Sequence, residues 1–391
     1  MSKNILVLEG EKPAAYAAIR SLQHSGYQIT AASHLKINIS RFSKYVSKFV
    51  SCPNIDKDME DYKNWLLEEI KNGDYLTVFS FSDKTTKLLS ENKSTLSAHT
   101  HIYQPDINTV DIVLDKSKTY QLAKSLGMNL PEIFETKGKK IDQLAAELTF
   151  PLVLRPKQKN YSVDGKIKYY KVTPDNYFWN RTDLLKKMPK FYNELDKYDL
   201  MSYVPGVGRG YFTIVDEQKT CGNFAHERIR EYPVSGGASS LRKSIPFEEI
   251  KAISLPLINA LNFSGPIMIE YKYDPKTNKY YLIEVNGRWW GSLPLAIHAG
   301  VDFPKLLIGL INKEKINAED FASYKMGFTS RLLIPHDIMW FVSCLIHGKF
   351  NLLPRFFKRA DKEDIFDGGD LGAYIAYVVS LFGQLKFLNN R

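Results

Sequence analysis

The sequence is poor in cysteine, and the three cysteines that it has are far apart. Cys52, Cys221 and Cys344 are odd in number and form no CxxC pair. A disulfide framework and a zinc knuckle both need cysteines at short, regular spacing, so neither is expected here. Scattered thiols of this kind are typical of proteins of the reducing cytoplasm.

Long apolar runs are also missing. The two apolar stretches near the end of the chain, 338–346 and 371–382, are each shorter than the roughly 20 residues that a bilayer-spanning helix needs. The N-terminal segment lacks the basic stretch followed by an apolar stretch that marks a signal peptide. We therefore expect neither a transmembrane helix nor a secretory leader.

Several functional signatures are absent as well. The turn after the first predicted strand has no GxGxxG, which argues against a dinucleotide site there. The sequence has neither a GxSxG motif nor a reactive-cysteine motif, so it gives no sign of a covalent nucleophile. Helix-turn-helix and zinc-finger patterns are missing, although the net charge is +10 and basic side chains outnumber acidic ones between Lys137 and Lys190. A basic excess in this β-rich stretch favours a polyphosphate such as ATP over nucleic acid.

The N-terminal part alternates strands with helices. Apolar runs at 4–9, 27–32 and 76–81 predict strands, and the segments 13–24 and 84–92 predict helices. Strands joined through helices by short turns predict a parallel sheet that is covered by helices. Asp83 precedes the second helix and is interpreted as its N-cap, with a substrate contact as the alternative.

The middle of the chain contains further strand patterns. They are separated by a basic loop that begins at Lys157 and by a glycine pair, Gly236 and Gly237, interpreted as part of a substrate loop or, alternatively, a turn. The predicted strands lie at 151–155, 167–173, 210–215, 221–228, 266–273 and 279–285.

The last two of these strands form a predicted hairpin that carries oxygen ligands. Glu270 lies on one strand, and Glu284 and Asn286 share a face of the next because they are two residues apart. Oxygen ligands of this kind suit magnesium, which completes its octahedron with phosphate oxygens and water. Arg288 follows on the same face, where its guanidinium would hold an anion.

The motif Glu284-Val-Asn-Gly-Arg288 resembles the ATP-grasp superfamily, in particular its carboxylate–amine ligase branch. Further elements of the resemblance follow the same order along the chain: Asp115-Lys116, Pro-Leu-Val-Leu-Arg-Pro at 151–156, Ser-Tyr-Val-Pro-Gly at 202–206, His-Glu-Arg-Ile-Arg-Glu at 226–231, Gly236-Gly237 and Glu270-Tyr-Lys272.

The resemblance implies an α/β and α+β fold in four segments. An N-terminal domain with a parallel, Rossmann-like sheet (pre-ATP-grasp domain) would occupy 1–112. The two lobes of the ATP-grasp fold would follow, a small lobe at 113–199 and a large lobe with the metal site at 200–328. A helical C-terminal extension would complete the chain at 329–391.

The resemblance also implies roles for individual residues. Adenine would lie near the hinge Met201, Ser202, Tyr203 and Val204. The phosphates would be contacted by Lys116, Arg155 and Lys157. Glu270, Glu284 and Asn286 would bind Mg²⁺, with Mn²⁺ as a substitute. Arg288 and one of Arg228 and Arg230 would stabilise the transferred phosphoryl group and the acceptor carboxylate. His226 alternates with Arg228 and Arg230 on one strand face and is a further candidate for contact with phosphate or substrate, with a structural role as the alternative.

The implied activity is ATP-dependent joining of a small-molecule carboxylate to an amine through an acyl phosphate, giving ADP and phosphate. The alternative is a degenerate ATP-binding sensor or membrane-peripheral scaffold without turnover. An ATP-grasp kinase or carboxylase with another acceptor is also compatible with the motifs. The sequence does not identify the carboxylate or the amine.

The C-terminal extension places basic and aromatic residues of 349–359 between two apolar stretches. One interpretation is a helical pair that packs on the rest of the protein or forms a homodimer interface. The other is peripheral contact of 336–388 with an anionic membrane, at the inner face of the cell membrane.

Overall fold

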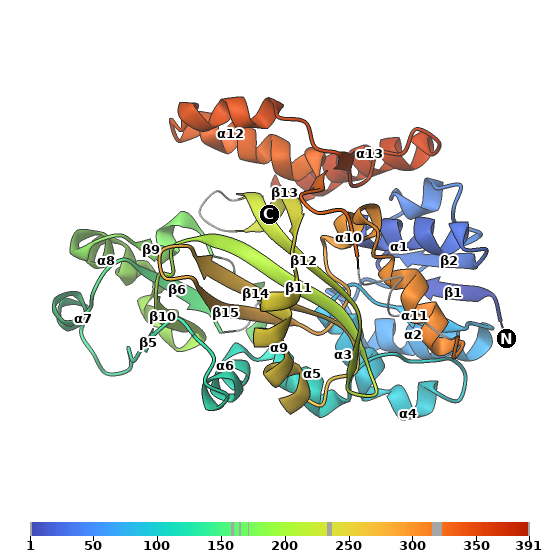
Figure 1. The fold of residues 1–391 in the computed structure, drawn as a ribbon, viewed down its shortest axis with the longest axis horizontal. Helices are drawn as coiled ribbons and strands as arrows, with labels where there is room; N and C mark the ends of the chain where they lie inside the picture. The colour runs from blue at the N-terminus through green and yellow to red at the C-terminus, as the bar shows by residue number, and fades with distance from the viewer. Residues whose placement is uncertain are drawn as a thin grey trace.

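The computed structural model describes residues 2–157, 160–163, 166–170, 172–232, 237–314 and 323–389, with 160–163, 166–169 and 384–389 described by their backbone alone. Within these ranges the chain forms three sheets and a small hairpin, with a C-terminal pair of helices laid across the top (Figure 1). None of the described helices is alone long and apolar enough to cross a bilayer. Helices α10 (Leu293–Ala299) and α11 (Phe303–Ile311) reach that length only together, across an 86° bend.

The N-terminal sheet is parallel throughout, in the order β3-β2-β1-β4. Its strands are β1 (Asn4–Val7), β2 (Gln28–Ser33), β3 (Lys48–Ser51) and β4 (Thr77–Phe79), and its helices are α1 (Pro13–His24), α2 (Met59–Asn72), α3 (Asp83–Glu91) and α4 (Lys93–Leu96). Ile5 and Val7 pack with α1, whereas Leu6 and Leu8 pack with α2 and α3. This alternation buries both faces and confirms the predicted helix-covered parallel sheet.

The small lobe contains an antiparallel sheet in the order β5-β10-β6-β9. The elements of this part are α5 (Ile107–Leu114), α6 (Lys116–Ser125), β5 (Ile133–Phe134), α7 (Ile141–Glu147), β6 (Leu152–Pro156), the hairpin β7 (Asn160–Val163) and β8 (Lys166–Tyr169), β9 (Tyr177–Phe178), α8 (Arg181–Lys187) and β10 (Tyr198–Ser202). Asp115 caps α6, because its side chain accepts hydrogen bonds from the N–H groups of Ser117 and Lys118.

The large sheet has the order β15-β14-β11-β12-β13-β16-β17. Its elements are β11 (Val207–Asp216), β12 (Lys219–Tyr232), β13 (Ala238–Ile245), α9 (Glu248–Ala260), β14 (Gly265–Asp274), β15 (Lys279–Asn286), α10 (Leu293–Ala299), α11 (Phe303–Ile311), β16 (Thr329–Arg331) and β17 (Lys362–Glu363). Gly206 enters the sheet at φ +114°, and a Cβ there would lie 2.1 Å from the Tyr273 carbonyl oxygen, so only glycine fits.

The C-terminal extension forms the predicted helical pair, α12 (Ile338–Ile346) and α13 (Leu371–Asn389). It is not a separate tail, since β16 and β17 lengthen the large sheet at one edge. The extension also reaches the N-terminal domain, where α13 packs against the turn Ser40–Phe42. The predicted limits of the domains stay a prediction. Helix α5 runs across the predicted boundary at residue 112.

Candidate active site

A cavity of about 1060 Å³ opens where the N-terminal domain, both lobes and the extension meet. Each unit supplies part of its wall, for example Lys12, Arg155, Glu270 and His336. Seven cationic side chains and three carboxylates line it. This excess of positive charge suits a polyphosphate ligand, because a cleft lined by one sign of charge concentrates ions of the other.

The three predicted metal ligands line this cavity together. Glu270 on β14 lies directly opposite Glu284 on β15, and Asn286 lies opposite Met268 two residues along the strand. Directly opposed residues in an antiparallel pair bring their Cβ atoms to about 5 Å, so both carboxylates can bind one ion. No group of three or more His, Cys, Asp or Glu in the described ranges could hold a metal ion. The two carboxylates and one amide are oxygen ligands, which is the kind that magnesium prefers, with phosphate oxygens and water completing the shell.

Each of the three ligands is contacted by a cation. The contacts are Arg228 with Glu270 at 2.7 Å, Lys116 with Glu284 at 3.5 Å, and Arg288 Nη2 with Asn286 Oδ1 at 3.2 Å. Burial opposes the charge of Arg228, but Glu270 and Glu231 outweigh it, so the pKa of Arg228 is raised and it stays charged.

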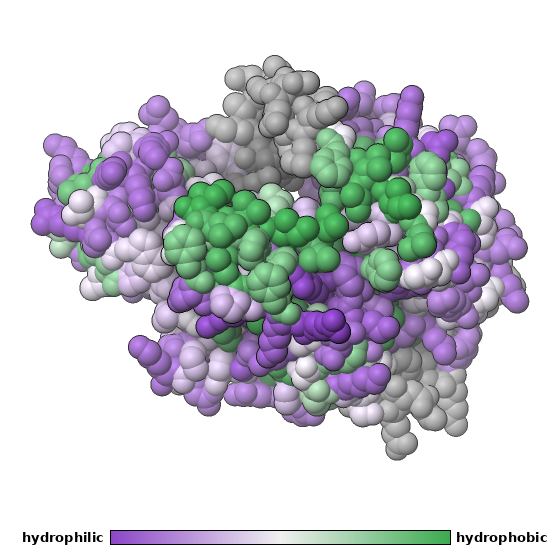
Figure 2. Space-filling view, turned by 90° about the horizontal axis from the view of Figure 1, so that it is seen from above, coloured by the Kyte–Doolittle hydropathy of each residue, from purple (hydrophilic) through white to green (hydrophobic). Residues whose placement is uncertain are grey.

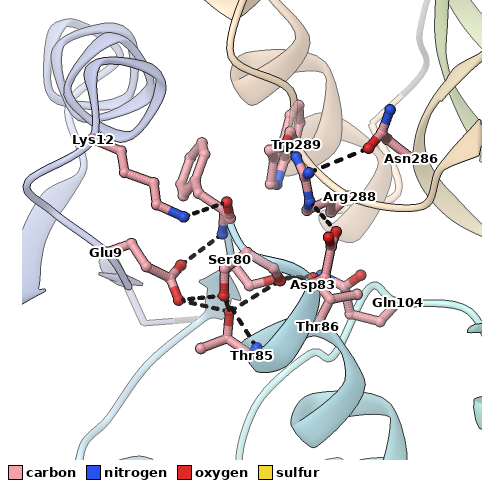
Figure 3. A network of polar contacts seen from close by, with 12 residues as sticks. Glu9, Lys12, Ser80, Asp83, Thr85, Thr86, Gln104, Asn286, Arg288 and Trp289 are labelled. Atoms are coloured by element: carbon pink, nitrogen blue, oxygen red, sulfur yellow. Dashed lines mark hydrogen bonds and ion pairs between the residues drawn. The ribbon is translucent and has the colours of Figure 1, made fainter. Parts of the chain in front are cut away.

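Arg288 is held by a carboxylate from another domain. Its Nε donates to Asp83 at the start of α3, and its Nη1 donates to the Trp289 carbonyl at 3.0 Å (Figure 3). The N-cap interpretation of Asp83 is wrong, because the Ser82 side chain caps α3 by accepting from the Thr85 N–H. Asp83 instead orients the guanidinium that Asn286 also contacts (Figure 3).

Arg230 does not join the other predicted residues in the cavity. The pairing of β12 with β13 shifts register between Arg228 and Arg230 and again before Glu231. A bulge of this kind moves the following side chains to the other face, so Glu231 lines the cavity in place of Arg230. Arg230 lies under the extension and donates two hydrogen bonds of 2.7 Å to Asp337.

At the predicted nucleotide end, the cavity is lined by Lys116, Arg155 and the hinge residues Met201, Ser202, Tyr203 and Val204. The N–H groups of Ser202 and Tyr203 already donate to the carbonyls of Glu132 and Pro151. Lys157 is outside the cavity wall, with its ammonium 2.8 Å from the Asp196 carbonyl oxygen. Gly236 and most of the predicted phosphate loop lie outside the described residues or are described by backbone alone.

Four cavity residues have buried polar atoms without a hydrogen-bond partner in the described chain. They are His226 at both ring nitrogens, Trp290 at Nε1, Arg242 at Nε and His336 at Nδ1. Burial, with Arg228 and Arg242 nearby, holds the pKa of His226 well below its usual value and keeps it neutral. Unpaired polar atoms at a cavity wall mark a place where a ligand can supply hydrogen bonds. His226 is the first residue of the motif at 226–231 and was already considered as a substrate or phosphate contact. The sequence patterns missed the other three: Trp290 follows the motif that ends at Arg288, and Arg242 lies on β13, a strand that was not predicted.

Residues 227–317 match the family model for the carbamoyl-phosphate synthase L chain, ATP binding domain. The carbamoyl phosphate synthase large chain of Saccharolobus solfataricus is 26% identical over 201 residues, which is 49% of this chain and 18% of that protein. The chain thus spans about a fifth of the length of the curated relatives that it matches.

The fold is shared with several solved enzymes. The biotin carboxylase domain of Hydrogenobacter thermophilus 2-oxoglutarate carboxylase, solved with MgADP, ADP and bicarbonate, aligns with a TM-score of 0.62 at 14% identity, covering 84% of this chain and 73% of that one. L-amino acid ligase from Bacillus licheniformis aligns with a TM-score of 0.58 at 15% identity, covering 84% and 78%. The chain has the ATP-grasp fold, and the predicted resemblance to the ATP-grasp superfamily is confirmed.

Proposed function

We propose that the protein is an ATP-dependent ligase that activates a carboxylate as an acyl phosphate and joins it to an amine. One observation carries the proposal: Glu270, Glu284 and Asn286 face the same cavity as Lys116, Arg155, Arg228 and Arg288. This set combines oxygen ligands for a cation with guanidinium and ammonium groups for a polyphosphate. The likeness to carbamoyl phosphate synthases and to an L-amino acid ligase supports it.

In the proposed reaction, a carboxylate oxygen bonds to the γ-phosphorus of ATP while the bond to the β-phosphate oxygen breaks and releases ADP. The amine nitrogen then bonds to the acyl carbon, phosphate leaves, and the nitrogen loses a proton to solvent. Magnesium, or manganese in its place, would be held by Glu270, Glu284 and Asn286 and would offset the charge of the phosphates. Arg228 and Arg288 would stabilise the transferred phosphoryl group and the acceptor carboxylate.

The hinge would contact adenine, with Lys116 and Arg155 at the phosphates. Lys157 and Arg230 are not part of this proposal, because both lie outside the cavity. The N–H groups at Trp290 Nε1 and Arg242 Nε would donate hydrogen bonds to substrate oxygens, and the neutral His226 ring would donate from one nitrogen and accept at the other. We place the reaction in the cytoplasm, where the free thiols of the three cysteines remain reduced.

A pairwise screen of amino acids and amino sugars tests the function. Each carboxylate is combined with each amine in the presence of ATP and Mg²⁺, and ADP and phosphate release are measured. We expect release that depends on both partners of one pair. ATP binding detected by thermal shift, without turnover for any pair, would favour the sensor alternative.

Removal of the Asp83 carboxylate should lower kcat. In Asp83→Ala, Arg288 loses the partner that fixes its orientation, and we expect a decrease of about tenfold or more in kcat, with a smaller change in KM for ATP. Steady-state kinetics on the pair found in the screen would measure it. Glu60→Gln, on the exposed face of α2, is the matched control and should leave both constants unchanged. An unchanged kcat in Asp83→Ala would contradict the orienting role of Asp83.

A further inference from the structure

The C-terminal extension exposes an unusual amount of apolar surface. Twelve of the 22 large apolar side chains that are exposed in the described chain lie between Ile338 and Phe382. On α13 they form one stripe, since Leu371, Ile375, Val379 and Phe382 are spaced by four, four and three residues. Figure 2 looks onto this face and shows the apolar side chains gathered beside hydrophilic ones.

The shorter helix α12 repeats the pattern. Ile338, Val342, Leu345 and Ile346 are exposed at helical spacing, and Ile346 retains 74% of its accessible surface. The 3₁₀ segment Phe350–Phe357, which follows α12, exposes both of its terminal phenylalanines. Apolar area of this extent on a folded protein marks a contact surface.

The opposite face of the extension is fixed to the protein by carboxylates. Asp337 binds Arg230, Asp364 binds Arg242, and Asp370 accepts from the Tyr16 hydroxyl at 3.0 Å. All three carboxylates are buried. These contacts determine which face of the extension is turned outward, so the apolar stripes are not the inner side of a detached segment.

The exposed charged side chains of the extension are mostly basic. Lys349, Arg355, Lys358, Arg359 and Lys362 are exposed, and Asp361 is the one exposed carboxylate among residues 338–382. The acidic groups of the extension thus mostly point inward and its basic groups outward. A surface that combines apolar stripes with surrounding cations is complementary to an anionic bilayer, which offers both hydrocarbon and negative headgroups.

A second copy of the chain is a poorer partner for this face. A two-fold interface would place the surface on itself and bring the bases of each copy near those of the other. Only Asp361 is exposed to offset them, and its carboxylate already accepts from the N–H and hydroxyl of Thr329. An anionic surface removes this repulsion.

We propose that residues 338–382 dock the protein on an anionic membrane surface, with the stripes of α12 and α13 at the boundary between headgroups and acyl chains. The docking does not depend on ligase activity. The same extension supplies Leu332, His336 and Tyr377 to the cavity wall, so the docked protein would hold its cavity close to the membrane.

Vesicle flotation with the intact protein tests the docking. The probes are vesicles of phosphatidylcholine alone and vesicles that also contain phosphatidylglycerol, each at low and high salt. We expect the protein to float with the anionic vesicles only, and binding to fall at high salt because the charges are screened.

Two double variants separate the contributions. Ile375→Ser with Val379→Ser should reduce the bound fraction at least about fivefold, and Lys358→Glu with Arg359→Glu at least about tenfold, because apolar insertion and attraction to anionic lipid both contribute to binding. These side chains are exposed, so the melting temperature should be unchanged. Lys118→Glu with Lys124→Glu, on the exposed face of α6, makes the same charge change elsewhere and should float like the wild type.

Three results would overturn the proposal. The first is that the protein does not float with anionic vesicles, and the second is that it floats equally well with neutral vesicles. The third is that the wild type sediments as a dimer, whereas the variant with Ile375→Ser and Val379→Ser sediments as a monomer. The last result would assign the surface to a second copy of the chain.

Discussion

Glu284→Gln should reduce turnover by about a thousandfold or more while leaving the fold intact. Glutamine has nearly the same shape as glutamate but no charge, so the pair of carboxylates formed by Glu270 and Glu284 loses half of its negative charge. A bound divalent cation contributes several kcal/mol to stabilising charge in a phosphoryl-transfer transition state, and about 1.4 kcal/mol corresponds to a tenfold change in rate. ADP release with the pair found in the screen is the measurement.

The matched control is Glu248→Gln, at an exposed position in the first turn of α9. Its turnover should equal that of the wild type, and both variants should melt within a few degrees of it. The Mg²⁺ concentration that gives half-maximal activity should rise in Glu284→Gln alone. A fully active Glu284→Gln protein with an unchanged Mg²⁺ requirement would contradict the metal assignment.

Asp337→Ala should be the most destabilising of the substitutions considered. Asp337 is completely buried and accepts hydrogen bonds of 2.7 Å from Arg230 and from the Ser240 hydroxyl. Its removal leaves Arg230, which is 4% exposed, as a buried charge without its carboxylate. Breaking one side of a buried pair typically costs about 3–5 kcal/mol of unfolding free energy. Chemical denaturation monitored by circular dichroism would measure the loss.

Two further variants identify the cause. Asp361→Ala removes an exposed carboxylate of the same extension and should cost about 1 kcal/mol or less. Replacing both partners, with Asp337→Leu and Arg230→Met, should recover part of the stability, because Arg230 is then no longer a buried charge without its carboxylate; recovery is partial because Arg331 also loses Asp337. Equal losses in Asp337→Ala and in the double variant would contradict the ion-pair explanation.

The sequence predicted most of the fold because its patterns are local. Pro13–His24 is a helix with the predicted limits, and the apolar stretch Ile338–Ile346 is a helix of the extension, since apolar spacing and terminal residues define both within one stretch of chain. The hairpin of β14 and β15 could be predicted in the same way from its two-residue periodicity. As expected, Glu270, Glu284 and Asn286 line one cavity. Their roles as ligands stay a prediction.

The remaining parts depend on tertiary contacts that periodicity does not encode. Arg230 follows Arg228 by two residues, yet a bulge in β12 turns it away, and nothing in the local sequence indicates the bulge. Asp83 and Arg288 are 205 residues apart, so their pairing is invisible along the chain. Asp337 and Asp364 are ordinary acidic residues in the sequence but are buried counterions in the fold.

The contact between Asp83 and Arg288 also limits how the N-terminal domain can be exchanged. A chimera that receives this domain from a relative would need a carboxylate just after the cap of the helix that follows the fourth strand. Without one, the transplanted domain could fold correctly and still leave the cavity-lining guanidinium of Arg288 without its orienting partner. In this chain the N-terminal unit is therefore not a freely interchangeable module.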